Sequence, residues 1–123
     1  MVRCLAKQIP LLSDFIASLP PAELTDVRRA GIQGARQGAF AAYYGFLQVA
    51  NHRALKGPYK EAVLGAMAET APQYASFLPP TTRQQVADVA ASMSAVVQGR
   101  LRGYVEQILR AMSETRCEGL CKF

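Results

Sequence analysis

Four glycines, Gly31, Gly34, Gly38 and Gly45, stand at helical spacing in the middle of this chain. Residues seven apart lie nearly on one line along a helix, so Gly31, Gly38 and Gly45 form a bare stripe. Because glycine costs a helix about 1 kcal/mol relative to alanine, we expect a close-packed neighbour on this glycine stripe. The stretch Gln37–Asn51 also contains no charged residue. A helix that is apolar on every side is buried on every side, so this segment is predicted to be the central helix of an all-helical protein.

The glycine stripe allows three interpretations. We favour close packing between helices of one molecule. The second is a homodimer face, because small residues let two helix backbones approach closely. The third is a ligand groove lined by Tyr43, Tyr44 and Phe46, although aromatic residues at helical spacing more often belong to a core.

Two proline pairs, Pro20-Pro21 and Pro79-Pro80, divide the chain into a short helix followed by a long helix, twice over. Proline suits the first turn of a helix and disfavours helix in the residue before it. Apolar residues recur every three or four positions between these breaks, which predicts helices. The predicted helices cover Pro10–Leu19, about 21–51, a third segment that starts near Pro58, and about 81–116. Pro72 predicts that the third segment is either one kinked helix or two stacked short helices, broken near 68–71.

This pattern predicts an all-α fold, an antiparallel four-helix bundle in which two long helices, about 21–51 and 81–116, pack with two shorter ones. A chain of 123 residues is enough for one core, so we expect a single helical domain over 1–123. The longest uncharged apolar run is shorter than the roughly 20 residues of a membrane span, so none is predicted. We also find no signal peptide, and Met1 is either native or added to a mature exported chain.

His52 is the only histidine, and no motif links it to a nucleophile or an acid. The sequence contains no Glu-x-x-His, no Gly-x-x-x-x-Gly-Lys and no His-Glu-x-x-His. We therefore expect no catalytic residues, no metal and no cofactor, and the protein is predicted not to be an enzyme.

A cluster of His52, Arg53, Lys56 and Lys60 stands between the second and third predicted helices. It is the candidate partner-binding surface, because such a cluster suits an acidic partner or a phosphate. The structural alternative, which we weight more heavily, is that these cations complement the dipole at the end of the preceding helix.

The net charge of +5 is otherwise carried by scattered residues. Two further basic groups could track a nucleic-acid backbone, but we favour solvated helix faces for both: Arg28, Arg29 and Arg36, and Arg100, Arg102 and Arg110. Because the basic groups are not interleaved with exposed aromatic residues, nucleic acid is an unlikely partner.

The three cysteines, Cys4, Cys117 and Cys121, lie near the chain ends. An antiparallel bundle would bring Cys4 towards the other two, within reach of a disulfide. A local bridge between Cys117 and Cys121 is the rival, and three free thiols in a reducing cytosol remain a further alternative.

From these features we expect a non-enzymatic protein-binding module, bacterial and periplasmic or otherwise extracytoplasmic. Immunity or inhibitor proteins that neutralise a secreted toxin or a cell-wall hydrolase have this general make-up, which is an analogy and not a motif. The alternative is a cytosolic basic helical protein that binds nucleic acid or assembles as a regulatory oligomer.

Overall fold

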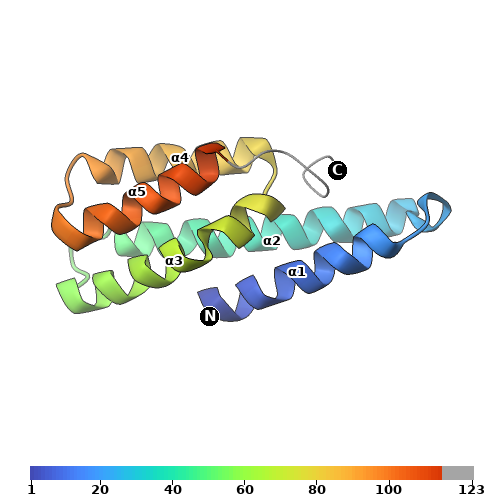
Figure 1. The fold of residues 1–123 in the computed structure, drawn as a ribbon, viewed down its shortest axis with the longest axis horizontal. Coiled ribbons are helices and arrows are strands. Elements are labelled where there is room, and N and C mark those ends of the chain that lie inside the picture. Colours follow the sequence, from blue (N-terminus) through green and yellow to red (C-terminus); the bar gives the residue numbers. More distant parts are fainter. Residues whose placement is uncertain (115–123) are drawn as a thin grey trace.

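A computed structural model describes residues 1–114 of the chain, which form five α-helices packed against one another and one short 3₁₀ turn. The all-α, bundle-like fold class is therefore confirmed (Figure 1). In chain order the elements are α1 (Val2–Ser18), η1 (Pro21–Glu23), α2 (Asp26–Ala50), α3 (Gly57–Phe77), α4 (Pro80–Ser94) and α5 (Gly99–Glu114).

Helix α3, and not α2, is the central element of the bundle. It packs against α1, α2 and α5, while α4 packs against α5 and α2. Its residues Leu64, Met67, Ala71 and Tyr74 have no exposed surface. Burial of large apolar side chains is the main favourable term in folding, so α3 provides the core on which the other helices assemble.

The prediction of one continuous helix over 81–116 is wrong. The chain breaks after Ser94, and α4 and α5 form an antiparallel pair joined by residues 95–98. Gly99 has a φ of 64°, in the left-handed region that residues other than glycine rarely adopt. The apolar period continues across the break because each of the two helices still buries one face, so periodicity alone does not reveal the turn.

The other boundaries also differ from expectation. Helix α1 runs through Pro10, and α3 runs through Pro72 as one helix, so the predicted alternative of two stacked short helices is wrong. Both prolines are exposed, and the burial of neighbouring turns compensates for the hydrogen bond that each proline removes. Helix α2 starts at Asp26 because the Thr25 hydroxyl accepts the backbone N–H of Arg28 at 3.3 Å, which caps its first turn.

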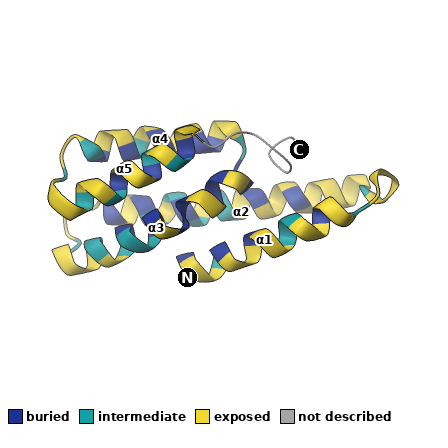
Figure 2. Cartoon of the chain, in the orientation of Figure 1, coloured by how far each residue is buried: buried dark blue, intermediate teal, exposed yellow. Residues whose placement is uncertain are grey.

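Close packing of the glycine stripe inside one molecule is also wrong. Gly31, Gly34, Gly38 and Gly45 are all exposed, and a Cβ added at any of them would meet no atom of residues 1–114 within 4 Å. Helix α2 buries only its opposite side, and Figure 2 shows exposed residues along much of its length. The stretch 37–51 is therefore not buried on every side. The homodimer interpretation of the stripe stays a prediction.

The predicted ligand groove cannot be lined by Tyr43, which lies in the core. Tyr43 is fully buried, and its hydroxyl donates to the carbonyl oxygen of Met67 in α3 at 2.8 Å. Its ring lies 4.4 Å, centroid to centroid, from that of Tyr74. Tyr43 is thus a core residue that joins α2 to α3.

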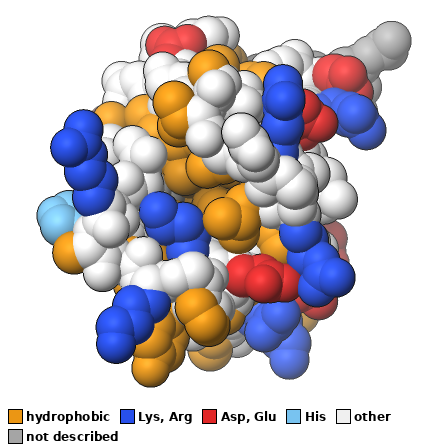
Figure 3. Space-filling view, turned by 90° about the vertical axis from the view of Figure 1, so that its left-hand side faces the viewer, with side chains coloured by type: hydrophobic (Ala, Val, Ile, Leu, Met, Phe, Trp, Pro, Cys, Tyr) orange, Lys and Arg blue, Asp and Glu red, His pale blue; other side chains and the backbone are white. Residues whose placement is uncertain are grey.

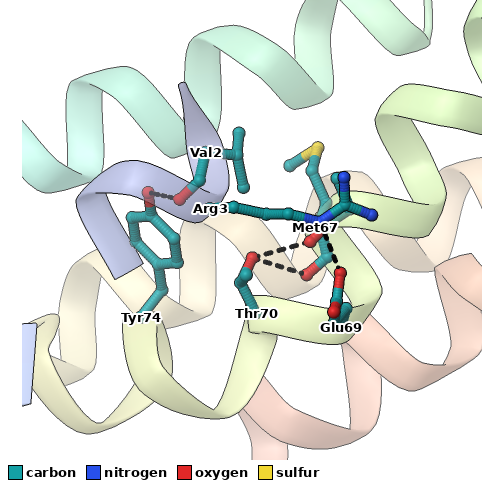
Figure 4. A network of polar contacts seen from close by, with 7 residues as sticks. Val2, Arg3, Met67, Glu69, Thr70 and Tyr74 are labelled. Atoms are coloured by element: carbon teal, nitrogen blue, oxygen red, sulfur yellow. Dashed lines mark hydrogen bonds and ion pairs between the residues drawn. The ribbon is translucent and has the colours of Figure 1, made fainter. Parts of the chain in front are cut away.

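The start of α1 is fixed to α3 by polar contacts (Figure 4). The buried hydroxyl of Tyr74 donates to the carbonyl oxygen of Val2 at 2.9 Å, and Arg3 Nε lies 2.6 Å from a carboxylate oxygen of Glu69. The ion pair is exposed and contributes little, whereas the buried hydrogen bond is costly to lose. Burial, with a smaller contribution from the charge of Cys4, raises the pKa of Tyr74 to about 12.

We predict that Gly38→Ala stabilises the protein by about 1 kcal/mol, because alanine is the better helix former and the added methyl group meets no neighbour. Gly99→Ala is the contrasting variant and should destabilise the protein by about 1 kcal/mol or more, because its φ of 64° strains a side chain. Urea denaturation measures both changes. A destabilising Gly38→Ala would show that this face is covered within the molecule.

Alkaline pH should unfold the protein in part through Tyr74. An unfolded tyrosine loses its proton near pH 10 and the folded Tyr74 near pH 12, so stability is full below about pH 10 and falls as the pH rises towards 12. The Tyr74→Phe variant should lose less stability than the wild type between pH 9.5 and 11.5, a window set by these two values.

Equilibrium unfolding across this range tests the alkaline behaviour, with the exposed Tyr59→Phe as the control that should follow the wild type. Parallel curves for wild type and Tyr74→Phe would contradict the prediction.

Candidate partner-binding end

The link between α2 and α3 and the link between α4 and α5 lie at the same end of the bundle, on the left in Figure 1. Arg100 at the start of α5 pairs with Glu61 at the start of α3, with 2.9 Å between nitrogen and oxygen. Helices α3 and α5 therefore begin side by side. We call this region the basic end and define it by His52, Arg53, Lys56, Lys60, Arg100 and Arg102.

The structure places all four residues of the predicted cluster at the basic end. His52, Arg53 and Lys56 lie in the link after α2, and Lys60 lies in the first turn of α3, where its N–H donates to the carbonyl oxygen of Lys56 at 3.0 Å. Nδ1 of His52 accepts the backbone N–H of Ala54 at 3.1 Å. The imidazole thus braces the link, while Arg53, Lys56 and Lys60 supply fixed positive charge.

The charge of the basic end is only partly neutralised. Arg100 pairs with Glu61 and Arg102 with Glu106, but Arg53, Lys56 and Lys60 make no ion pair within residues 1–114. The first turns of α3 and α5 contain no acidic residue, although helix N-termini favour negative charge. Two positive helix ends and unneutralised cations therefore act together here.

The dipole interpretation of the cluster applies to His52 and Arg53, which directly follow the end of α2, and not to Lys56 and Lys60. The last turn of α2 contains no basic residue, so its C-terminal dipole is not complemented from within the helix. Lys56 and Lys60 lie instead at the beginning of α3, where the dipole disfavours a cation. Stability of the helices therefore does not account for cations at these two positions.

Apolar side chains are exposed among these charges. Val49, Tyr59 and Val96 are 52%, 64% and 74% exposed. Figure 3 looks onto this end and shows Lys and Arg side chains around hydrophobic ones. An open depression of about 480 Å³ lies beside the link between α2 and α3, and it is lined by Gln48, Val49, His52, Ala54 and Leu55.

Arg100 and Arg102 were not predicted to belong to this surface. A continuous helix over 81–116 would carry them in its middle, far from either end. The break before Gly99 brings them to the start of α5. Gly99 was the available signal, but a glycine inside a helical pattern indicates a bend as readily as a reversal.

Arg36 is buried, so its predicted place on a solvated helix face is wrong. Its Nε donates to the carbonyl oxygen of Phe77 at 2.7 Å and so caps the C-terminal end of α3, where a cation is favoured. Burial, with the charge of Arg83 in addition, lowers the pKa of Arg36. Its spacing from Ile32 and Tyr43, which are also buried, was the sequence signal for this position.

Cys4 is exposed on α1, and Cys117 and Cys121 lie outside the described residues. The predicted crosslink therefore stays a prediction.

Within residues 1–114, no helix has the length and apolar character that a membrane span requires. The same part of the chain holds no group of three His, Cys, Asp or Glu side chains arranged to bind a metal ion.

Comparison of this chain with protein-family models, with curated proteins and with solved structures found no match.

Proposed function

We propose that this protein is a non-enzymatic protein-binding module whose basic end docks on an acidic surface of another protein. The observation that supports this is the set of three cations, Arg53, Lys56 and Lys60, without an ion pair in residues 1–114 and beside the N-termini of two helices. Such a surface accelerates encounter with a negatively charged partner and disfavours a positive one.

The inhibitor or immunity role is part of this proposal. A helical body with a group of cations at one end suits the blocking of an acidic cleft. Enzymes that hydrolyse glycosidic bonds generally place a pair of Asp or Glu residues in such a cleft, so a cell-wall hydrolase offers complementary charge. The extracytoplasmic location is supported by the terminal cysteines Cys4, Cys117 and Cys121, which suit an oxidising compartment.

We expect the double variant Arg53→Glu/Lys56→Glu to bind its partner at least about tenfold more weakly, because like charges then face the acidic surface. The matched control is Lys7→Glu/Arg110→Glu, which changes the net charge equally on exposed parts of α1 and α5. Proteins captured from the source organism by the wild type are identified, and the affinity of each variant for them is then measured.

A partner that binds both double variants equally would contradict a role for the basic end. Salt-sensitive binding of oligonucleotides, with no protein captured, would favour the nucleic-acid alternative instead.

A further inference from the structure

The depression at the basic end is lined by residues that are chain neighbours of two cations without an ion pair in residues 1–114. Arg53 stands between His52 and Ala54, which both line the depression, and Lys56 directly follows Leu55, which also lines it. An apolar hollow and two cations therefore lie within a few residues of each other on one link.

We propose that the partner's docking segment is an acidic amphipathic peptide segment, in which one apolar side chain enters this depression and flanking carboxylates pair with Arg53 and Lys56. This inference rests on the proposed function and names the chemistry of the partner. It commits to a protein segment as the occupant, on the basis of charge complementarity around an apolar hollow.

The size and lining of the depression fit this occupant. The depression is open to solvent, and its volume of about 480 Å³ leaves room for a large side chain such as Leu or Phe to lie against it. The side chains of Val49 and Leu55 supply apolar contact. Because Nδ1 of His52 accepts the N–H of Ala54, a neutral imidazole carries its proton on Nε2 and can donate from there.

An anionic membrane surface fits the basic end less well than a protein segment does. A bilayer is broad and flat, whereas a single projecting side chain fills a hollow. The carboxylates of Glu61 and Glu106, in the first half of α3 and α5, would also lie close to anionic headgroups. A protein partner can place its acidic groups away from both of these carboxylates.

Three synthetic peptides test the inference by fluorescence anisotropy with the full chain. The first is a glutamate-rich peptide with a central leucine, the second replaces that leucine by serine, and the third replaces every glutamate by lysine. We expect the leucine peptide to bind at least about tenfold more tightly than the serine peptide, because the loss of one apolar side chain from a pocket typically weakens binding by that factor or more. The lysine peptide should not bind.

Val49→Ser provides the matched test on the protein, because Val49 is half exposed and its replacement spares the core. This variant should lose the preference for leucine yet keep its affinity for the serine peptide. Val27→Ser alters an exposed valine at the start of α2, away from the basic end, and it should behave as the wild type does.

Equal binding of the two acidic peptides would overturn the inference while leaving the proposed function in place. Failure of both acidic peptides to bind would count against the proposed function itself. Vesicles of phosphatidylserine and phosphatidylcholine test binding to an anionic membrane surface. Tighter binding to these vesicles than to the leucine peptide, unchanged by Val49→Ser, would overturn the inference in favour of a membrane surface.

Discussion

The burial of α3 is the constraint on which the rest of the structure depends. Each neighbouring helix contributes apolar side chains to it, and polar side chains fix the arrangement by bonding to backbone carbonyls. Tyr43 of α2 donates to Met67, Arg36 of α2 donates to Phe77, and Tyr74 of α3 itself donates to Val2. Burial drives the helices together without direction, whereas these buried hydrogen bonds define where each helix lies.

The reversal between α4 and α5 builds the candidate site from this framework. Because the chain turns back at residues 95–98, α5 begins at the same end as α3 and brings Arg100 and Arg102 with it. The surface then combines two helix N-termini, which carry partial positive charge, with cations from the α2–α3 link and from the first turns of α3 and α5. A straight helix through this region would have separated these groups by many turns.

Part of this arrangement could be predicted from the sequence, and part could not. His52, Arg53, Lys56 and Lys60 are close in the chain, so their grouping follows from local structure. The prediction that a neighbouring helix covers the glycine stripe was wrong for a different reason. Gly31, Gly38 and Gly45 do share one helix face, but whether a neighbour covers that face depends on where α2 lies in the bundle.

The sequence by itself determined the helical class, the apolar faces and the basic link after α2, because helix periodicity and capping act over a few residues. Only the tertiary structure decided that α3 is central, that Arg36 is buried at the end of α3, and that α5 joins α3 at the basic end. These features depend on contacts between residues far apart in the chain. An apolar helix face in the sequence indicates which side of the helix is buried. It does not determine which of several possible neighbours buries that side.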